Sequence, residues 1–375
     1  MTKEPADAAM MRHAKAEDGP IAKSPVAAGR PSRKGLSAAS GLGWLAGLGV
    51  VGWLIARSDT HSLWAAVLQV KTWLIVIAAW HALPLLFDSI GWKVLLTPPA
   101  RLGRLMLARW VGEGANALLP IPHLGELLRA HLARTPHHGG AVTGASVLAD
   151  ITLGVTSQVL FTVVGLILIG HLRDGELALN PVALLAPLGG FVIAFFVVQR
   201  TGALSAMAER IGRSIGGTGG LFQGATLQRL DEALAAIYRR RLAVAGSVVW
   251  HFAAWAISAG EIWILLRVLG HPIPVTAAVS IESLSQAARV AAFFIPAGLG
   301  AQEGALLALA VHSGVPAETA LAVALIKRAR ELSLGLPALA IGYLWERRLR
   351  GQRNRIEDGV GGVKSEPLVW RTTGG

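Results

Sequence analysis

The sequence has no cysteine and few charged residues. Without cysteine there can be no disulfide, thiolate metal site, cysteine nucleophile or S-palmitoylation. Charged residues fill 15% of the 375 positions, whereas a soluble domain has about 25%. Neither a Walker loop nor a His-Glu-x-x-His motif occurs. These absences exclude a soluble protein, and we expect neither an enzyme nor a bound cofactor.

Long apolar runs are present instead. Hydrophobic residues make up 53% of the chain, and several runs reach about twenty residues, the length that spans a bilayer as a helix. The runs are continuous and do not alternate, which argues against a transmembrane β-barrel. We therefore predict an all-α polytopic membrane protein with about six full spans. The expected spans cover residues 36–56, 73–96, 141–170, 181–199, 242–269 and 317–345.

Polar segments divide the chain. Residues 1–35 hold seven Lys and Arg and are rich in Ala and Pro, so we predict a disordered basic tail near anionic lipid. The transmembrane domain covers 36–345, and residues 346–375 form a second polar tail. The loop 200–241 contains an amphipathic helix, which can lie in the membrane interface or pack on the transmembrane core, and we favour the interface. Its apolar positions are Leu227, Leu230, Leu234 and Ile237.

Positive charge predicts the orientation. The chain has 35 Lys and Arg against 23 Asp and Glu, a net charge of +12. Most of the excess lies in tails and polar loops, as in cytoplasmic loops of membrane proteins, so we do not expect a nucleic-acid partner. We predict a bacterial inner-membrane protein with both termini cytoplasmic. The segments 93–140 and 200–241 are expected inside, and 57–72, 171–180 and 270–274 outside.

Two interrupted apolar segments decide the topology. If residues 101–134 crossed the membrane once, the basic loop 200–241 would lie outside. The segment must therefore enter and return as a re-entrant hairpin, and the same parity makes 273–314 a second one. The halves 36–170 and 181–345 then each read span, span, hairpin, span, in opposite orientations. Inverted repeats with broken helices are typical of transporters.

Both hairpins contain Pro, then Gly, then Glu. Pro and Gly break helices in membranes, and the freed backbone groups need protein or water. The predicted hairpin-breaking residues are Pro120, Pro122, Gly125, Pro296, Gly298 and Gly300. Charge recurs in or near the apolar segments, and we take seven residues as candidate substrate-binding groups. They are Glu126, Arg129, Asp150, Glu282, Arg289, Glu303 and Arg328.

A charge at the bilayer centre costs about 2.5–3.5 kcal/mol, so these side chains must pair or line a wet cavity. One interpretation is that ion pairs lock the helices together, and the other is that the charges form a polar path for a lipid headgroup. The 25 residues between Glu303 and Arg328 are enough for the hairpin to end and the last helix to return to similar depth. We expect His81 and His251 to be buried and hydrogen-bonded, and no metal site at His137 and His138.

These motifs resemble the membrane domain of lysylphosphatidylglycerol synthase, a flippase-like family. The matching residues are those of the two hairpins together with Asp150 and Arg328, and the resemblance covers roughly residues 40–345. The stretches 283–296, 326–337 and 149–154 look like the subgroup associated with hopanoid biosynthesis. Two departures are His123, where many members have Arg, and the stretch 146–148, where many have Glu-Arg.

The resemblance implies a lipid transporter, with a hopanoid or a phospholipid as substrate. A non-catalytic accessory subunit of lipid-biosynthetic enzymes and an intramembrane lipid-modifying enzyme remain alternatives. Residues 346–375 are polar and few, so we expect none of the aminoacyl-transferase domain that some members carry. The expected partners are the lipid substrate, an anionic lipid surface at the basic tails and, as a further option, a second copy of the chain.

Overall fold

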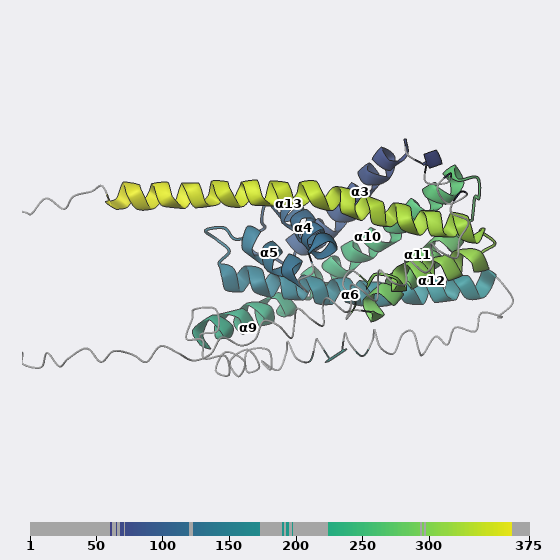
Figure 1. Cartoon of the computed structure of the whole chain (residues 1–375). Helices are drawn as coiled ribbons and strands as arrows, with labels where there is room; N and C mark the ends of the chain where they lie inside the picture. Colours follow the sequence, from purple (N-terminus) through teal and green to yellow (C-terminus); the bar gives the residue numbers. More distant parts are fainter. Residues whose placement is uncertain are drawn as a thin grey trace, which may run out of the picture. The chain divides into compact units, whose positions relative to one another are not determined.

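The computed structural model describes residues 72–119, 123–172, 224–292 and 298–361, together with 61, 65, 68–70, 190, 193, 194, 197 and 295. All of them belong to one compact unit, residues 33–375. The predicted spans 36–56 and 181–199 and the tail 1–35 lie outside the described residues, apart from a few single positions. Within the described part every element is a helix, as predicted (Figure 1). The helices are α3 Leu74–Lys93, α4 Leu102–Leu118, α5 Leu124–Leu132, α6 Gly140–Leu172, α9 Gly224–Arg239, α10 Arg241–Val268, α11 Val275–Ala291, α12 Ala301–His312 and α13 Ala317–Gly361.

Three helices are long and apolar enough to cross a membrane. Among the described residues these are α3, α6 and α10, which correspond to the predicted spans 73–96, 141–170 and 242–269. Helix α13 begins where the predicted last span begins, but it is not among these three helices. This helix continues past residue 345 to Gly361, and Figure 1 shows it as one rod that extends beyond α4. The first part of the predicted C-terminal tail is therefore helical.

The two predicted hairpins are pairs of helices in contact. The first consists of α4, which ends at Leu118, and α5, which begins at Leu124, and the second of α11, which ends at Ala291, and α12, which begins at Ala301. The residue before the second helix has a positive φ in both, 59° at His123 and 81° at Gly300. Gly298 also has a positive φ. Pro120, Pro122 and Pro296 lie outside the described residues.

Gly125 has a different role from the one predicted. It lies inside α5, where a Cβ would come within 2.2 Å of the Gly112 carbonyl oxygen in α4. Real Cβ atoms essentially never approach this closely, so only glycine lets the two helices touch here. Gly125 therefore closes the hairpin rather than breaking the helix.

The described helices pack in a pattern that repeats between the halves. Helix α4 packs on α13, just as α11 packs on α6. Within each hairpin the two helices touch, and its second helix touches the long helix that follows. Helices α3 and α10, which hold the matching place in each half, contact each other. The pattern is the one expected when two similar halves pair around a two-fold axis.

Helix α9 packs on the helical core. Leu234, Ile237 and Tyr238 form a buried cluster with α6 residues such as Ala149 and Leu153. Leu227 is also buried, with 6% of its surface exposed. The predicted amphipathic helix is correct, but the prediction that its apolar face lies in the membrane interface is wrong.

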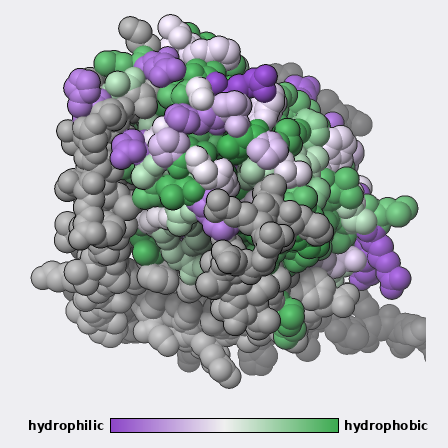
Figure 2. Space-filling model, turned by 90° about the vertical axis from the view of Figure 1, so that its right-hand side faces the viewer, coloured by the Kyte–Doolittle hydropathy of each residue, from purple (hydrophilic) through white to green (hydrophobic). Residues whose placement is uncertain are grey.

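The helices have two chemically different ends. At one end, which we call the basic end, Arg240 donates to the carbonyl oxygens of Val94 and Leu95, and Arg104 lies over the Trp345 ring. The cations here include Lys93, Arg101, Arg104, Arg134, Arg239, Arg240 and Arg241. At the other end the start of α3 meets the end of α10, where Gln69 donates to the Val268 carbonyl. Figure 2 looks onto this second end and shows hydrophilic side chains scattered among hydrophobic ones.

Candidate functional site

Asp150 on α6 is the centre of a buried ionic cluster. Arg109 from α4 donates to its Oδ2 at 2.6 Å, and Arg129 from α5 donates to the same oxygen. His251 from α10 meets the other oxygen, with 3.0 Å between Nε2 and Oδ1. Asp150 is only 1% exposed. The first hairpin is therefore fixed to α6 through the Asp150 carboxylate. The ion pairs offset the free-energy cost of burying this charge.

The same cluster extends to α3 through His251. Its Nδ1 lies 2.5 Å from Oδ1 of Asp88, and Nη1 of Arg109 lies 3.6 Å from the other Asp88 oxygen. Trp92 packs against the Arg129 guanidinium, 4.6 Å from the ring centroid. We call Asp88, Arg109, Arg129, Asp150 and His251 the Asp150 cluster.

A second and larger cluster surrounds α13. Lys327 Nζ lies 2.5 Å from Glu282 Oε2 on α11 and 3.8 Å from Glu261 on α10. Arg330 Nε lies 2.8 Å from Glu261. Both cations are buried. These pairs hold α10, α11 and α13 together at one level.

The pair predicted from the 25-residue spacing is also here. Arg328 donates to Glu303 Oε1 from Nε at 2.9 Å and from Nη2 at 2.6 Å. Its Nη1 donates to Glu331 at 2.7 Å, and Glu331 also accepts from Arg289 on α11 at 3.0 Å. We call the whole set the α13 cluster. Its members are Glu261, Glu282, Arg289, Glu303, Lys327, Arg328, Arg330 and Glu331.

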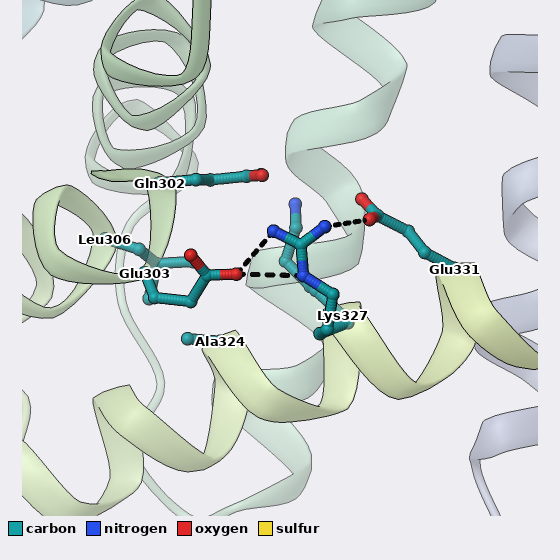
Figure 3. A pocket seen from close by; sticks show the side chains of 7 residues that line it. Gln302, Glu303, Leu306, Ala324, Lys327 and Glu331 are labelled. Carbon is teal, nitrogen blue, oxygen red and sulfur yellow. Dashed lines mark hydrogen bonds and ion pairs between the residues drawn. The ribbon is translucent and has the colours of Figure 1, made fainter. Parts of the chain in front are cut away.

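A pocket opens beside these charges. In Figure 3, Glu303 and Glu331 reach from opposite sides toward the guanidinium between them, with Gln302 beside it. The pocket is lined by Gln302, Glu303, Leu306, Ala324, Lys327, Arg328 and Glu331. It lies where α12 begins, next to the break of the second hairpin. Acidic and basic groups thus face one small space inside a helical bundle.

Glu303 has a second bond that fixes the hairpin. Its Oε2 accepts the backbone N–H of Gly300 at 2.7 Å, which satisfies a helix N-terminal donor that would otherwise lack a partner. Glu303 is 3% exposed. This carboxylate therefore joins the hairpin break, α12 and α13.

The two clusters are separate sites. His251 of the Asp150 cluster and Glu261 of the α13 cluster are ten residues apart on α10, which is about 15 Å along the helix. The predicted substrate residues Asp150 and Arg328 therefore do not share one site. Glu113 lies between the clusters, within electrostatic reach of Arg109 and of Arg330.

The halves place opposite charges at matching helix positions. Arg109 is the eighth residue of α4 and Glu282 the eighth of α11. Asp150 is the eleventh residue of α6 and Lys327 the eleventh of α13. In the first half the acid Asp150 pairs with Arg109 and Arg129 of the hairpin. In the second half the cation Lys327 pairs with the acids Glu282 and Glu261.

Glu126 is an exception to this pattern, because the matching position in the other half has the same charge. It is the third residue of α5, as Glu303 is of α12. Its Oε1 accepts from the Asn116 amide at 3.0 Å, while its buried Oε2 has no hydrogen-bond partner among the described residues. The Nδ1 atom of His123 lies 3.9 Å from this oxygen. Residue 151, which follows Asp150, is Ile, where Arg328 follows Lys327.

Charges that are neighbours on one helix pair with each other in some cases and with other helices in the rest. The i,i+3 pair Arg328–Glu331 is present. Glu126 and Arg129 each turn to another partner, as do Glu282 and Arg289. His251 is buried and hydrogen-bonded, and His81 contacts Glu113 at 3.4 Å.

Sequence reasoning missed most of the Asp150 cluster. Arg109, Asp88 and His251 were not among the predicted site residues. Arg109 gave a signal, because it is a charge within the interrupted apolar segment 101–134 and such residues need a buried partner. The pairing of His251 with Asp88 had no sequence signal, since 163 residues separate them.

Comparison with protein-family models assigns the chain to a family. The family model described as lysylphosphatidylglycerol synthase TM region matches residues 41–338. The chain belongs to this family. Lysylphosphatidylglycerol synthase TM region proteins are membrane-domain proteins, so membership and the apolar helices together make the chain a lipid-related membrane protein. Searches among curated proteins and among solved structures each found no match.

Proposed function

We propose that the chain is a flippase-like lipid transporter of the bacterial inner membrane. The pocket of the α13 cluster is the observation that carries the proposal. It presents carboxylates and cations together next to a broken helix, which is where transporters with inverted repeats bind polar substrate groups. A lipid phosphate would replace a carboxylate against Arg328 or Lys327, and an amine would replace a cation against Glu303.

The packing of the helices supports an inverted repeat of six spans and two re-entrant hairpins. Matching contacts occur between the halves, and the basic end collects cations as a cytoplasmic face does. The orientation can be tested with single cysteines, since the natural chain has none. A membrane-impermeant reagent applied to intact cells should label residues 171–180 and spare 200–241 and both termini. Labelling of 200–241 would contradict this topology.

The substrate is proposed to be a hopanoid or a phospholipid. The likeness of residues 283–296 to the hopanoid-associated subgroup favours the hopanoid. The basic end would rest on anionic lipid, where each Lys or Arg near the surface contributes about 1 kcal/mol. A second copy of the chain is a further proposed partner.

An accessory role in lipid biosynthesis is the second candidate. It is favoured by the charge balance of the α13 cluster, in which four acids face four cations. A network in which every charge is paired is compatible with a purely structural role, in which the ion pairs hold helices together. An accessory subunit should keep its function when Glu303 is neutralised, provided that it still folds.

The deciding experiment is lipid movement across vesicles that contain the purified protein. Glu303→Gln should reduce translocation of a headgroup-labelled lipid while the protein remains folded, because Arg328 keeps Glu331 as partner. The control is Arg229→Gln, which removes an exposed cation on α9. Full activity of the Glu303→Gln protein would overturn the proposal. If that variant does not accumulate, Gln302→Leu serves as a second change in the pocket lining.

A further inference from the structure

His251 is hydrogen-bonded at both ring nitrogens. Nδ1 faces Asp88 Oδ1 at 2.5 Å, and Nε2 faces Asp150 Oδ1 at 3.0 Å. An ionised carboxylate only accepts hydrogen bonds, whereas a neutral imidazole has one N–H. With both carboxylates ionised, the two contacts are satisfied together only when the ring carries two protons. The ring is then an imidazolium.

The three side chains form a line from the interior outward. Asp150 is 1% exposed and His251 is 2% exposed, whereas the Asp88 side chain is 24% exposed. Asp88 is thus the member that the protein encloses least. A proton on Nδ1 of His251 has a route out through this carboxylate.

The other charged side chains around His251 form ion pairs with partners of their own. From α4, Arg109 contacts both carboxylates, and from α5, Arg129 donates to Asp150. The charged groups that face the ring from α3 and α6 are Asp88 and Asp150 themselves. Farther along α10, Glu261 contacts Lys327 and Arg330 of α13, and Lys327 also contacts Glu282 of α11.

His251 also has a special place between the halves. The other buried ion pairs among the described residues join helices of the same half. His251 belongs to α10 of the second half, but both its partners belong to α3 and α6 of the first half. The pair His131–Glu346 also crosses, at side chains that are 42% and 26% exposed. His251 is therefore a buried ionic link between halves that would have to move relative to each other during transport.

We propose that His251 and Asp88 form a proton-binding site that couples lipid movement to a proton gradient. This inference rests on the proposed transport function. When the Nδ1 proton passes to Asp88 and then to water, the ring becomes neutral, and its freed lone pair faces a carboxylate oxygen. That contact is repulsive, so the link between the halves opens. Uptake of a proton from water through Asp88 restores the imidazolium and closes it.

The test uses vesicles that contain the full chain, a headgroup-labelled lipid and an imposed pH difference. If one proton moves per lipid, a difference of about one pH unit shifts the leaflet ratio about tenfold. We expect this shift for the natural protein and none for His251→Gln or Asp88→Asn. The matched control is His81→Gln, since His81 contacts Glu113 within the first half. The control should respond as the natural protein does.

Failure of coupling and failure of transport give different results. If the lipid equilibrates but the leaflet ratio ignores the pH difference, the proton site is wrong and the transport proposal stands. If no lipid moves, the transport proposal fails, and nuclear magnetic resonance of ¹⁵N-labelled histidine rings decides the site. The His251 signal is the one that His251→Gln removes. A neutral His251 ring at pH 7 would overturn the site, whereas an imidazolium that loses its proton more readily in Asp88→Asn would support it.

Discussion

The ion pair between Glu303 and Arg328 allows a quantitative prediction. Arg328→Met leaves Glu303 buried with Gly300 N–H as its remaining hydrogen-bond donor. Stranding one member of a buried pair costs about 3–5 kcal/mol in the free energy of unfolding. Glu303→Gln is milder, because the amide oxygen can still accept from Gly300 and Arg328 keeps Glu331 at 2.7 Å. We expect about 1.5–3 kcal/mol for this loss of bonds to a charged group.

The double variant tests whether the two residues act on each other. With both charges gone, no carboxylate is stranded, so its loss of stability should be smaller than the sum of the two single losses. Residues in direct contact typically differ from additivity by about 0.5–3 kcal/mol, and we expect at least about 1 kcal/mol here because Arg328 makes two bonds to Glu303. Unfolding by SDS titration in mixed micelles, followed by circular dichroism, measures all four proteins.

The control cycle mutates Glu126 in place of Glu303. Glu126 is the acid at the matching position of the other half. Glu126→Gln combined with Arg328→Met should be additive within about 0.5 kcal/mol, as for distant sites. Additivity in the Glu303 cycle as well would refute the reasoning, since the contact would then carry no energy of its own. A simple charge reversal is less informative, because Arg at position 303 could not accept the Gly300 N–H.

Two further changes follow from the first hairpin. Asp150→Asn should lower the amount of protein in the membrane, because it leaves two buried arginines without their carboxylate. Glu126→Gln should leave the amount unchanged, since Glu126 bonds the neutral Asn116. Immunoblots of membranes compare the two variants, and an equal loss in both would contradict this difference. Gly125→Ala should destabilise the protein, because its Cβ would lie 2.2 Å from a carbonyl oxygen of α4. Gly139→Ala is the control, with nothing within 4 Å of its Cβ, and equal thermal stability of the two variants would show that the hairpin can relax.

Features with a local cause could be predicted from the sequence. The helix breaks follow from Pro and Gly in apolar segments, and the described spans follow from length and hydropathy. The contact between Glu303 and Arg328 was within reach for a similar reason. One hairpin arm and one turn connect them, so chain length fixes their relative depth.

Features that depend on tertiary packing could not be predicted. Asp150 was among the seven candidate residues, but its partners Arg109 and His251 were not. Which side chain meets a buried charge depends on how the helices pack sideways, and spacing along one chain contains no such information. The same limit applies to α9, because an apolar face looks alike whether it meets lipid or another helix.

The contacts between the halves complete the argument for movement. Where α4 meets α13, a Cβ on Gly114 would lie 2.9 Å from the Gly335 carbonyl oxygen. Where α6 meets α11, a Cβ on Gly165 would overlap the Ser283 hydroxyl. Close packing of small residues holds these interfaces, and among the described residues no ion pair within 4 Å joins α4 to α13 or α6 to α11. The buried ion pairs instead make each half rigid, and His251 is the buried charge that joins the two. A single proton on that ring can therefore bias the relative position of the halves without disturbing the pairs inside either one.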